Sequence, residues 1–412
     1  MQPPTPVAGA GISGSDRLER IDPQVRKGSI FVYRAFDVAQ EIDLAAAERI
    51  LSQGTGIGPG AITGPSSSSA TGSAAGAAGK SRLTFARMNR YALVMRNAPV
   101  RLALGESTLR LGTETVIAET SATVWDYGVI SIAFQIPIPT DATFSQLIPR
   151  SMILNGDPKG TEEIDQIARR RSQELVTLLQ GAMKQPTEWK VFEDYVIFYF
   201  EELNGIRTAQ DLIHNSLLPE LILGEPPELL SAQSRSAILE NHYQYAANDL
   251  VVIDWNTAVV LEPSGQRDIM DVLEFALTHL LEVRYYDDLL DTRLAELYDA
   301  IEIKRGRTLQ GYFSRLSHEA NSRYLEFSEF TERVDNSLKI VGDFYLAVIF
   351  RGAMRRFRVQ DWQSSITRKM NLLARVSELL QGEINVFRGH MLELTVIFLI
   401  LFEIVSAILH RA

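Results

Sequence analysis

The chain has 412 residues, of which 46% are hydrophobic and 22% are charged, so it can bury one or two sizeable cores. It contains no cysteine, which excludes disulfides, cysteine-ligated zinc and thiol catalysis. Its formal net charge of −10 at pH 7 argues against nucleic-acid binding over the whole surface.

Residues 1–26 are predicted to form a disordered tail. The segment carries Pro3, Pro4 and Pro6 and has no apolar core, so it is not a secretory signal peptide. Glycines at 9, 11 and 14 match a dinucleotide-binding pattern, but no strand precedes them, and we interpret the match as coincidence.

Residues 27–265 are predicted to form an α+β head domain. Runs of β-branched and aromatic residues predict its strands, and apolar residues spaced by three and four predict its helices. A Gly-, Ala- and Ser-rich stretch at 54–80 predicts a flexible loop, and the phosphate-loop pattern at 74–81 follows no strand. The expected strands cover 29–33, 91–95, 116–118, 122–135, 195–200 and 250–261, and the expected helices cover 42–51, 161–183 and 209–223.

Residues 266–390 change to an all-helical pattern. Apolar residues recur every three or four positions in three successive series, which predicts a long antiparallel coiled-coil stalk. We expect nearly all of these residues to serve core packing. The series include Leu273, Ala276, Leu280 and Val283, then Phe313, Leu316 and Leu338, then Trp362, Ile366 and Leu373.

Residues 391–409 form an apolar run that predicts a single C-terminal transmembrane helix. At about 1.5 Å per residue such a helix is roughly 28 Å long, close to the ~30 Å of bilayer hydrocarbon. About thirteen Leu, Ile, Val and Phe residues favour insertion by roughly 4 to 8 kcal/mol, which exceeds the roughly 2.5 to 3.5 kcal/mol cost of Glu403. The alternative is a buried core helix, which would need apolar cover on all sides.

The two acidic residues of this run suggest self-association. Glu393 would lie among the headgroups, whereas Glu403 would lie near the bilayer centre and is expected to be protonated at a contact with another copy. The predicted membrane and oligomer residues are Glu393, Leu394, Phe398, Phe402 and Glu403.

A basic cluster precedes the last predicted helix. Its four arginines either offset the dipole at the end of a helix or form an anion-binding tip. A helix from residue 361 would place this tip about 45 Å from the membrane, far beyond the ~8 Å Debye length, so RNA or an acidic protein fits it better than lipid headgroups. The cluster consists of Arg351, Arg355, Arg356 and Arg358.

The sequence shows no catalytic constellation. The six histidines lack paired metal-ligand spacing, and the His279–Glu282 pair lacks the second pair that a di-metal site requires. We therefore predict no cofactor, no metal and no catalytic residue, and we identify no small-molecule substrate.

The chain resembles the required-for-meiotic-nuclear-division family, also called domain of unknown function 155. The resemblance depends on the ten-residue interval between Glu393 and Glu403, the Trp362-led helix, the 335–339 stretch and the turn at 126–129. The 125–133 strand and the 207–261 stretch depart from the family pattern. The resemblance implies a homo-oligomeric membrane protein that, in mitochondria, tethers ribosomes at the inner membrane, with no catalytic activity and no cofactor.

These patterns predict a non-enzymatic, membrane-anchored, homo-oligomeric scaffold that tethers translation machinery, RNA or another anionic partner. Its body would be cytoplasmic, anchored in the cell inner membrane or, in a eukaryote, in the mitochondrial inner membrane. One alternative is a CorA-like ion-transport component, although that type has two spans and a Gly-Met-Asn loop, whereas here one span is predicted and Lys369 precedes Met370. The other alternative is an enzyme with an unidentified site in the head.

Overall fold

The structure is a computed structural model. The expected strand at 91–95, most of the expected tail and loop, and the middle helical series lie outside the residues that it describes. Those residues are 20–55, 84–87, 97–187, 189–206, 208–303 and 343–409, with isolated positions between 322 and 332.

A ten-stranded mixed sheet forms the centre of the molecule, in the order β10-β11-β12-β9-β1-β6-β5-β4-β3, with the short strand β7 paired to β1. The pairs along this order are antiparallel except β12 and β9, which run parallel. A separate small sheet pairs β2 (Ala39–Ile42) with β8 (Met183–Pro186). The strands of the large sheet are β1 (Gln24–Asp37), β3 (Thr84–Arg87), β4 (Val100–Leu111), β5 (Glu114–Val124), β6 (Val129–Pro137), β7 (Ala142–Thr143), β9 (Phe192–Asn204), β10 (His242–Tyr243), β11 (Leu250–Ile253) and β12 (Thr257–Leu261).

Strand β1 shows why this sheet lies between two layers of helices. Successive side chains of a strand point to opposite faces, and here both sets are apolar and buried. Ile30 and Val32 belong to one hydrophobic cluster, whereas Phe31 and Tyr33 belong to another on the opposite face. The sheet is therefore buried on both sides.

In the described part of the chain, six α-helices that precede α7 cover the first face. Phe144, Ile164 and Leu212, from three of these helices, pack into the cluster that contains Ile30. The helices are α1 (Leu44–Thr55), α2 (Phe144–Gly156), α3 (Pro158–Leu179), α4 (Ala209–Asn215), α5 (Leu218–Leu223) and α6 (Ala232–Leu239).

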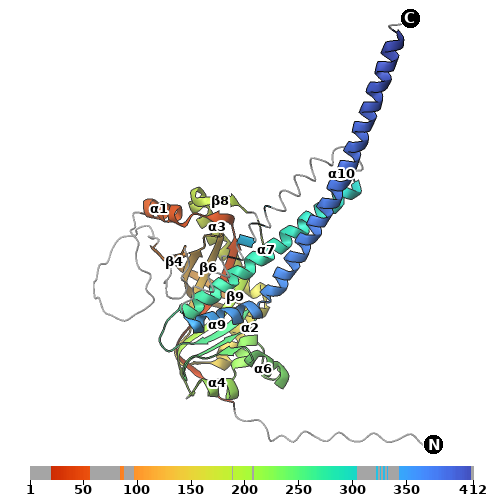
Figure 1. Cartoon of the computed structure of the whole chain (residues 1–412). Helices are drawn as coiled ribbons and strands as arrows, with labels where there is room; N and C mark the ends of the chain where they lie inside the picture. Colours follow the sequence, from red (N-terminus) through yellow and green to blue (C-terminus); the bar gives the residue numbers. More distant parts are fainter. Residues whose placement is uncertain are drawn as a thin grey trace, which may run out of the picture.

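The second face is covered by α7 (Asp268–Ile303), α9 (Phe344–Arg356) and the first turns of α10 (Val359–Leu409). Figure 1 shows α7 and α9 lying across this face and α10 carrying the C-terminus away from it. The predicted fold class was wrong, because the molecule is built on one large mixed sheet rather than on a head and a stalk.

The predicted coiled-coil stalk at 266–390 is wrong in particular. Leu273, Ala276 and Val283, which were assigned to a helical seam, pack in the same cluster as Phe31 of the sheet. Ile366 of the third series belongs to that cluster as well. The three–four spacing is correct for helices, but in α7 the apolar face is buried against a sheet.

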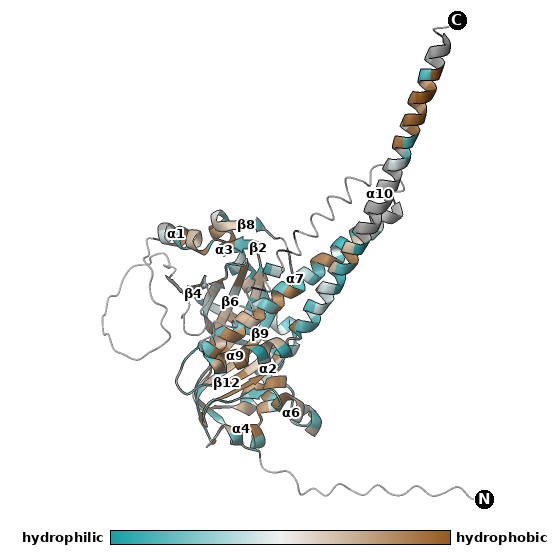
Figure 2. Cartoon of the chain, viewed as in Figure 1, coloured by the Kyte–Doolittle hydropathy of each residue, from teal (hydrophilic) through white to brown (hydrophobic). Residues whose placement is uncertain are grey.

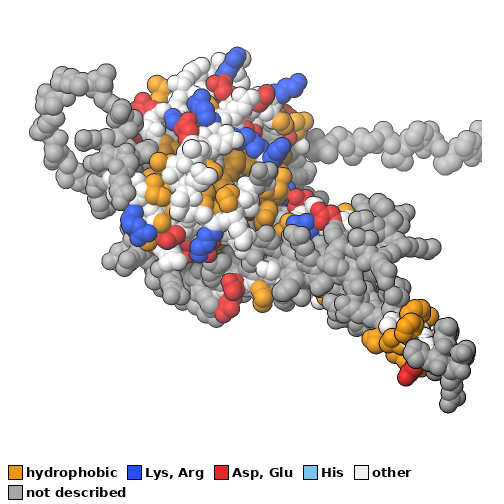
Figure 3. All heavy atoms as spheres, turned by 90° about the horizontal axis from the view of Figure 1, so that it is seen from above, with side chains coloured by type: hydrophobic (Ala, Val, Ile, Leu, Met, Phe, Trp, Pro, Cys, Tyr) orange, Lys and Arg blue, Asp and Glu red, His pale blue; other side chains and the backbone are white. Residues whose placement is uncertain are grey.

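The predicted transmembrane helix at 391–409 is also wrong. Among the helices in the described part of the chain, none joins sufficient length with sufficient apolarity to cross a membrane. The run is the end of α10, where Glu393 and Glu403 interrupt exposed apolar side chains. Figures 2 and 3 show the apolar character of this end of the helix. The predicted inner-membrane location, which depended on this helix, is wrong for the same reason. The lipid bilayer as a partner stays a prediction.

Candidate functional site

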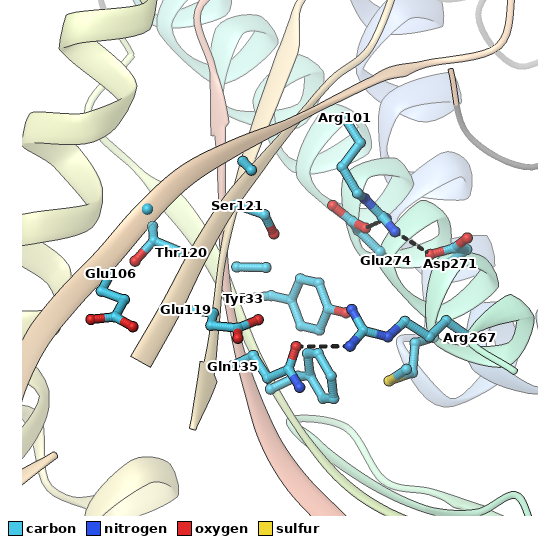
Figure 4. A pocket seen from close by; sticks show the side chains of 15 residues that line it. Tyr33, Arg101, Glu106, Glu119, Thr120, Ser121, Gln135, Arg267, Asp271 and Glu274 are labelled. Carbon is cyan, nitrogen blue, oxygen red and sulfur yellow. Dashed lines mark hydrogen bonds and ion pairs between the residues drawn. The ribbon is translucent and has the colours of Figure 1, made fainter. Parts of the chain in front are cut away.

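A polar cavity of about 330 Å³ lies between the sheet and the N-terminal turns of α7. Its walls come from β1, β4, β5 and β6 on one side and from α7 and the residue before it on the other (Figure 4). Apolar side chains form most of this sheet–helix interface, although it also buries other polar groups, such as the Asp254 carboxylate that binds Arg356. At the cavity, the polar groups border an open space.

The strand register explains why these side chains share one face. Tyr33 pairs with Ala133, which pairs with Ser121, which pairs with Ala103, across four adjacent strands. Directly opposite residues of an antiparallel pair point to the same face. Three residues of this row, Ala103, Ser121 and Ala133, have small side chains. Their small size leaves the space that the cavity occupies.

Arg101 of β4 is bound to two carboxylates on the first turns of α7. Its Nη1 lies 2.9 Å from Oδ1 of Asp271, and its Nη2 donates to Oε2 of Glu274 at 2.7 Å. The side chains of Asp271 and Glu274 are 7% and 1% exposed, so these charges are buried together. Burial opposes the charge of Arg101, but the two carboxylates outweigh it and raise the pKa of the guanidinium.

Burial also controls two other groups in the cavity. It raises the pKa of Glu274, against the opposing charge of Arg101. It raises the pKa of Tyr33 well above the usual range, and the negative charge of Glu274 adds to this effect. The phenol of Tyr33 is therefore protonated at neutral pH and serves as a hydrogen-bond donor.

Arg267 enters the cavity from the opposite side to the strands. Its Nη2 donates to Oε1 of Gln135 at 2.8 Å, and its guanidinium carbon lies 5.3 Å from the ring centroid of Phe31. The amide of Gln135 donates in turn to Ser29 at 3.2 Å. No carboxylate of the described residues forms an ion pair with Arg267, unlike Arg101, whose charge is offset twice.

Two glutamates oppose each other on the strand side of the cavity. Glu106 of β4 pairs directly with Glu119 of β5, next to an irregular register at Ala103 and Gly105. Gly105 has φ of +81°, a conformation that glycine adopts without strain. Like charges in directly opposite positions destabilise a strand pair, and in the described structure neither glutamate has a cationic partner.

Comparison with known proteins identifies the family to which the chain belongs. A family described as "Uncharacterized protein MJ0711, N-terminal domain" matches residues 27–268, more than half of the chain. The chain belongs to this family. The resemblance to the meiotic nuclear division family was therefore wrong.

A relative of the chain is the uncharacterized protein MJ0711 of Methanocaldococcus jannaschii. It is 22% identical over 241 residues, which cover 57% of this chain and 72% of the relative. No solved structure matches the chain. The segment that defines the MJ0711 N-terminal domain family ends at residue 268, where α7 begins, so it includes Tyr33, Arg101 and Arg267 and stops just before Asp271.

The predicted arginine tip lies outside the segment matched by the MJ0711 family, at the junction of α9 and α10. Arg351, Arg355 and Arg358 are exposed and Arg356 is half-buried, and all but Arg351 bind partners that are described below. These bonds leave less guanidinium surface for an external anion, and the anion-binding role stays a prediction. Arg355 donates to the Tyr243 hydroxyl at 3.2 Å, Arg356 to Asp254 at 2.8 Å and Arg358 to Asp361 at 2.7 Å.

The predicted oligomer residues also lie outside the matched segment, near the end of α10. Leu394, Phe398 and Phe402 are 61%, 70% and 65% exposed. Glu393 lies 3.7 Å from Nδ1 of His390. Self-association through these residues and Glu403 stays a prediction.

Metal chemistry finds no support in the described residues, because no group of three or more His, Asp or Glu side chains could hold an ion. The His279–Glu282 pair is buried in α7, and burial lowers the pKa of His279 to about 3. His279 is therefore neutral. The two glycine-rich patterns at 9–14 and 74–81 fall outside the described residues.

Sequence reasoning did not find the cavity. The signal lies in the first half of α7, where polar residues recur at spacings of three and four among mostly apolar residues. Thr278 of this stripe exchanges a hydrogen bond of 2.7 Å with the Tyr127 hydroxyl. The buried stripe is Asp271, Glu274, Thr278 and Glu282, spaced by three and four.

Proposed function

We propose that this chain is a binding protein that holds a small charged organic molecule in the cavity between the sheet and α7. The observation that carries the proposal is the set of charged side chains that line this cavity, among them Arg101, Arg267 and Glu274. A volume of about 330 Å³ lies at the small end of ligand-pocket sizes, which run from roughly 300 to 1,000 Å³.

Fold stability does not account for these buried charges. Replacing a buried ion pair by well-packed apolar residues is often neutral or stabilising. A layer of side chains that serves only to hold the fold together therefore does not require a buried ion pair. Arg101, Asp271 and Glu274 instead form a polar wall in which two ion pairs hold the side chains in place before any ligand binds. Such preorganisation lowers the entropic cost of binding.

Binding agrees better with the protonation of the cavity than catalysis does. The raised pKa values of Tyr33 and Arg101 leave both groups protonated at neutral pH, so neither serves as a general base. Glu274 is bound to Arg101 and is not poised to transfer a proton. These groups are suited to donating hydrogen bonds and to setting the local charge.

The expectation of a scaffold for translation machinery came with the resemblance to the meiotic nuclear division family. Because the chain belongs to a different family, that resemblance no longer supports the scaffold function. The cavity supplies an observation in favour of small-molecule binding, which is why we place this proposal first.

Ligand-induced thermal stabilisation tests the proposal. A panel of amino acids, amines, carboxylates, sugars and nucleotides would be screened against the wild-type chain and against Ala103→Phe, whose ring would fill the cavity. Thr115→Phe, at an exposed position of β5, is the matched control. We expect at least one compound to raise the melting temperature of the wild type and of the control but not of Ala103→Phe. Stabilisation that persists in Ala103→Phe, or no stabilisation by any compound, would contradict the proposal.

A further inference from the structure

The charges of the cavity are arranged on two opposite sides. Figure 4 shows Arg267 approaching from the α7 side, while Glu106 and Glu119 lie on the strand side, with Tyr33 between them. Arg101 does not alter this separation, because two carboxylates already offset its charge. A ligand that fits must therefore meet a cation at one end and two anions at the other.

Arg267 is suited to a carboxylate. A guanidinium offers five N–H donors in a planar fork that matches a carboxylate in two-point geometry. One donor is engaged by the neutral amide of Gln135, and Phe31 supports the plane of the group. The positive charge is thus held in a fixed orientation and is not offset by an ion pair within the described structure.

Glu106 and Glu119 are suited to an ammonium group. They lie directly opposite each other on β4 and β5, and both are exposed, so a cation that enters from solvent can reach the two carboxylates together. Glu274 is different, because its carboxylate accepts from Arg101 and also interacts with the hydroxyls of Thr123 and Ser131. Glu106 and Glu119 are therefore the two cavity glutamates without a cationic partner in the described protein.

The distance between the two sides is short. Gln135, which binds Arg267, is the direct cross-strand neighbour of Glu119. Cβ atoms of such neighbours are about 4.5 to 5.5 Å apart, so the side chain that binds Arg267 lies next to Glu119. Phe31 and Met270 supply apolar surface along this path for a short carbon chain.

From this arrangement we infer that the ligand is a small zwitterion of the amino-acid type. Its carboxylate binds Arg267, its ammonium group binds between Glu106 and Glu119, and its carbon chain lies against Phe31. The inference rests on the proposed function and adds the chemical class of the ligand. Phosphates and dicarboxylates are disfavoured because their second negative charge would face the carboxylates of the cavity.

Isothermal titration with matched compounds tests the inference. The zwitterions are glycine, β-alanine and γ-aminobutyrate, and the single-charge analogues are propylamine and butyrate. We expect at least one zwitterion to bind at least tenfold more tightly than both analogues. Arg267→Gln should weaken the zwitterion at least tenfold and leave propylamine unchanged, whereas Glu119→Gln should weaken both the zwitterion and propylamine.

The control variant is Glu202→Gln, an exposed carboxylate on β9 that does not line the cavity, and its affinities should equal those of the wild type. If an amine, a carboxylate or another class binds as tightly as every zwitterion and is blocked by Ala103→Phe, the proposed function stands and the zwitterion inference is overturned. If no compound shows binding that Ala103→Phe blocks, both are overturned.

Discussion

Nη2 of Arg101 donates to Oε2 of Glu274 at 2.7 Å, across the interface between strand β4 and helix α7. The two residues are 173 positions apart in sequence. The bond joins the segment shared with the MJ0711 family to the helix that follows it, and it forms one wall of the proposed binding cavity.

Removing the cation of this pair should be strongly destabilising. Arg101→Met would leave Asp271 and Glu274 buried without a compensating charge, which typically costs about 3 to 5 kcal/mol. Urea unfolding followed by circular dichroism measures this loss. Arg110→Met, at an exposed position of the same strand, should change the free energy of unfolding by no more than about 0.5 kcal/mol. Equal effects of the two substitutions would show that the Arg101 pairs contribute little.

His279 should make the fold sensitive to acid. Burial lowers its pKa to about 3, whereas the unfolded chain takes up the proton near pH 6.5. The free energy of unfolding should therefore fall as the pH drops from 6.5 towards 3, by at most about 1.4 kcal/mol per pH unit from this group. His279→Gln should show a shallower decline, and the exposed His214→Gln should match the wild type. Identical acid profiles of all three proteins would refute the assignment.

Glu193 should have the opposite effect to His279 on the pH dependence of the free energy of unfolding. Burial raises its pKa to about 7, although Arg284 opposes the shift, so the folded chain binds more protons than the unfolded chain between pH 4.5 and 7. The free energy of unfolding should decrease as the pH rises through this window. Glu193→Gln removes the titrating group, and its stability relative to the wild type should improve from pH 5 to pH 8. A constant difference across this range would mean that Glu193 titrates normally.

Gly128 should not tolerate a side chain. Its φ is +92°, and an added Cβ would lie 1.6 Å from the backbone oxygen of Ala39, in the turn between β5 and β6. Gly128→Ala should lower the free energy of unfolding by roughly 3 kcal/mol or more, which thermal denaturation would detect. Gly156→Ala is the matched control, because a Cβ there meets nothing within 4 Å. Comparable melting temperatures for the two variants would contradict the predicted clash.

The sequence predicted individual helices and strands correctly where their hydrophobic periodicity was strong. The strand predicted at 29–33 lies within β1, and the strand predicted at 195–200 lies within β9. The helix predicted at 161–183 corresponds to α3, and the helix predicted at 209–223 is divided into α4 and α5. Helices and strands with clear periodicity are visible without tertiary information.

The tertiary arrangement could not be predicted from the sequence, because hydrophobic periodicity does not show which element packs against the apolar face of a helix. Leu273 and Val283 would show the same spacing against another helix as they show against the sheet. The cavity was missed for a related reason, since Arg101 and Glu274 come together only through the packing of β4 on α7. The match between residues 391–409 and the bilayer thickness likewise led to a membrane prediction that the structure contradicts.

The most direct test of binding in the cavity uses Met270, which lines it and is 1% exposed. The chain has nine methionines, and ¹³C-methyl labelling gives each a separate NMR signal, with Met270 assigned through Met270→Leu. Titration with the compound that binds most tightly should shift the Met270 signal in a saturable manner and leave Met370, buried in α10, unchanged. An unmoved Met270 signal at saturating compound, or an equal shift of Met370, would contradict the account.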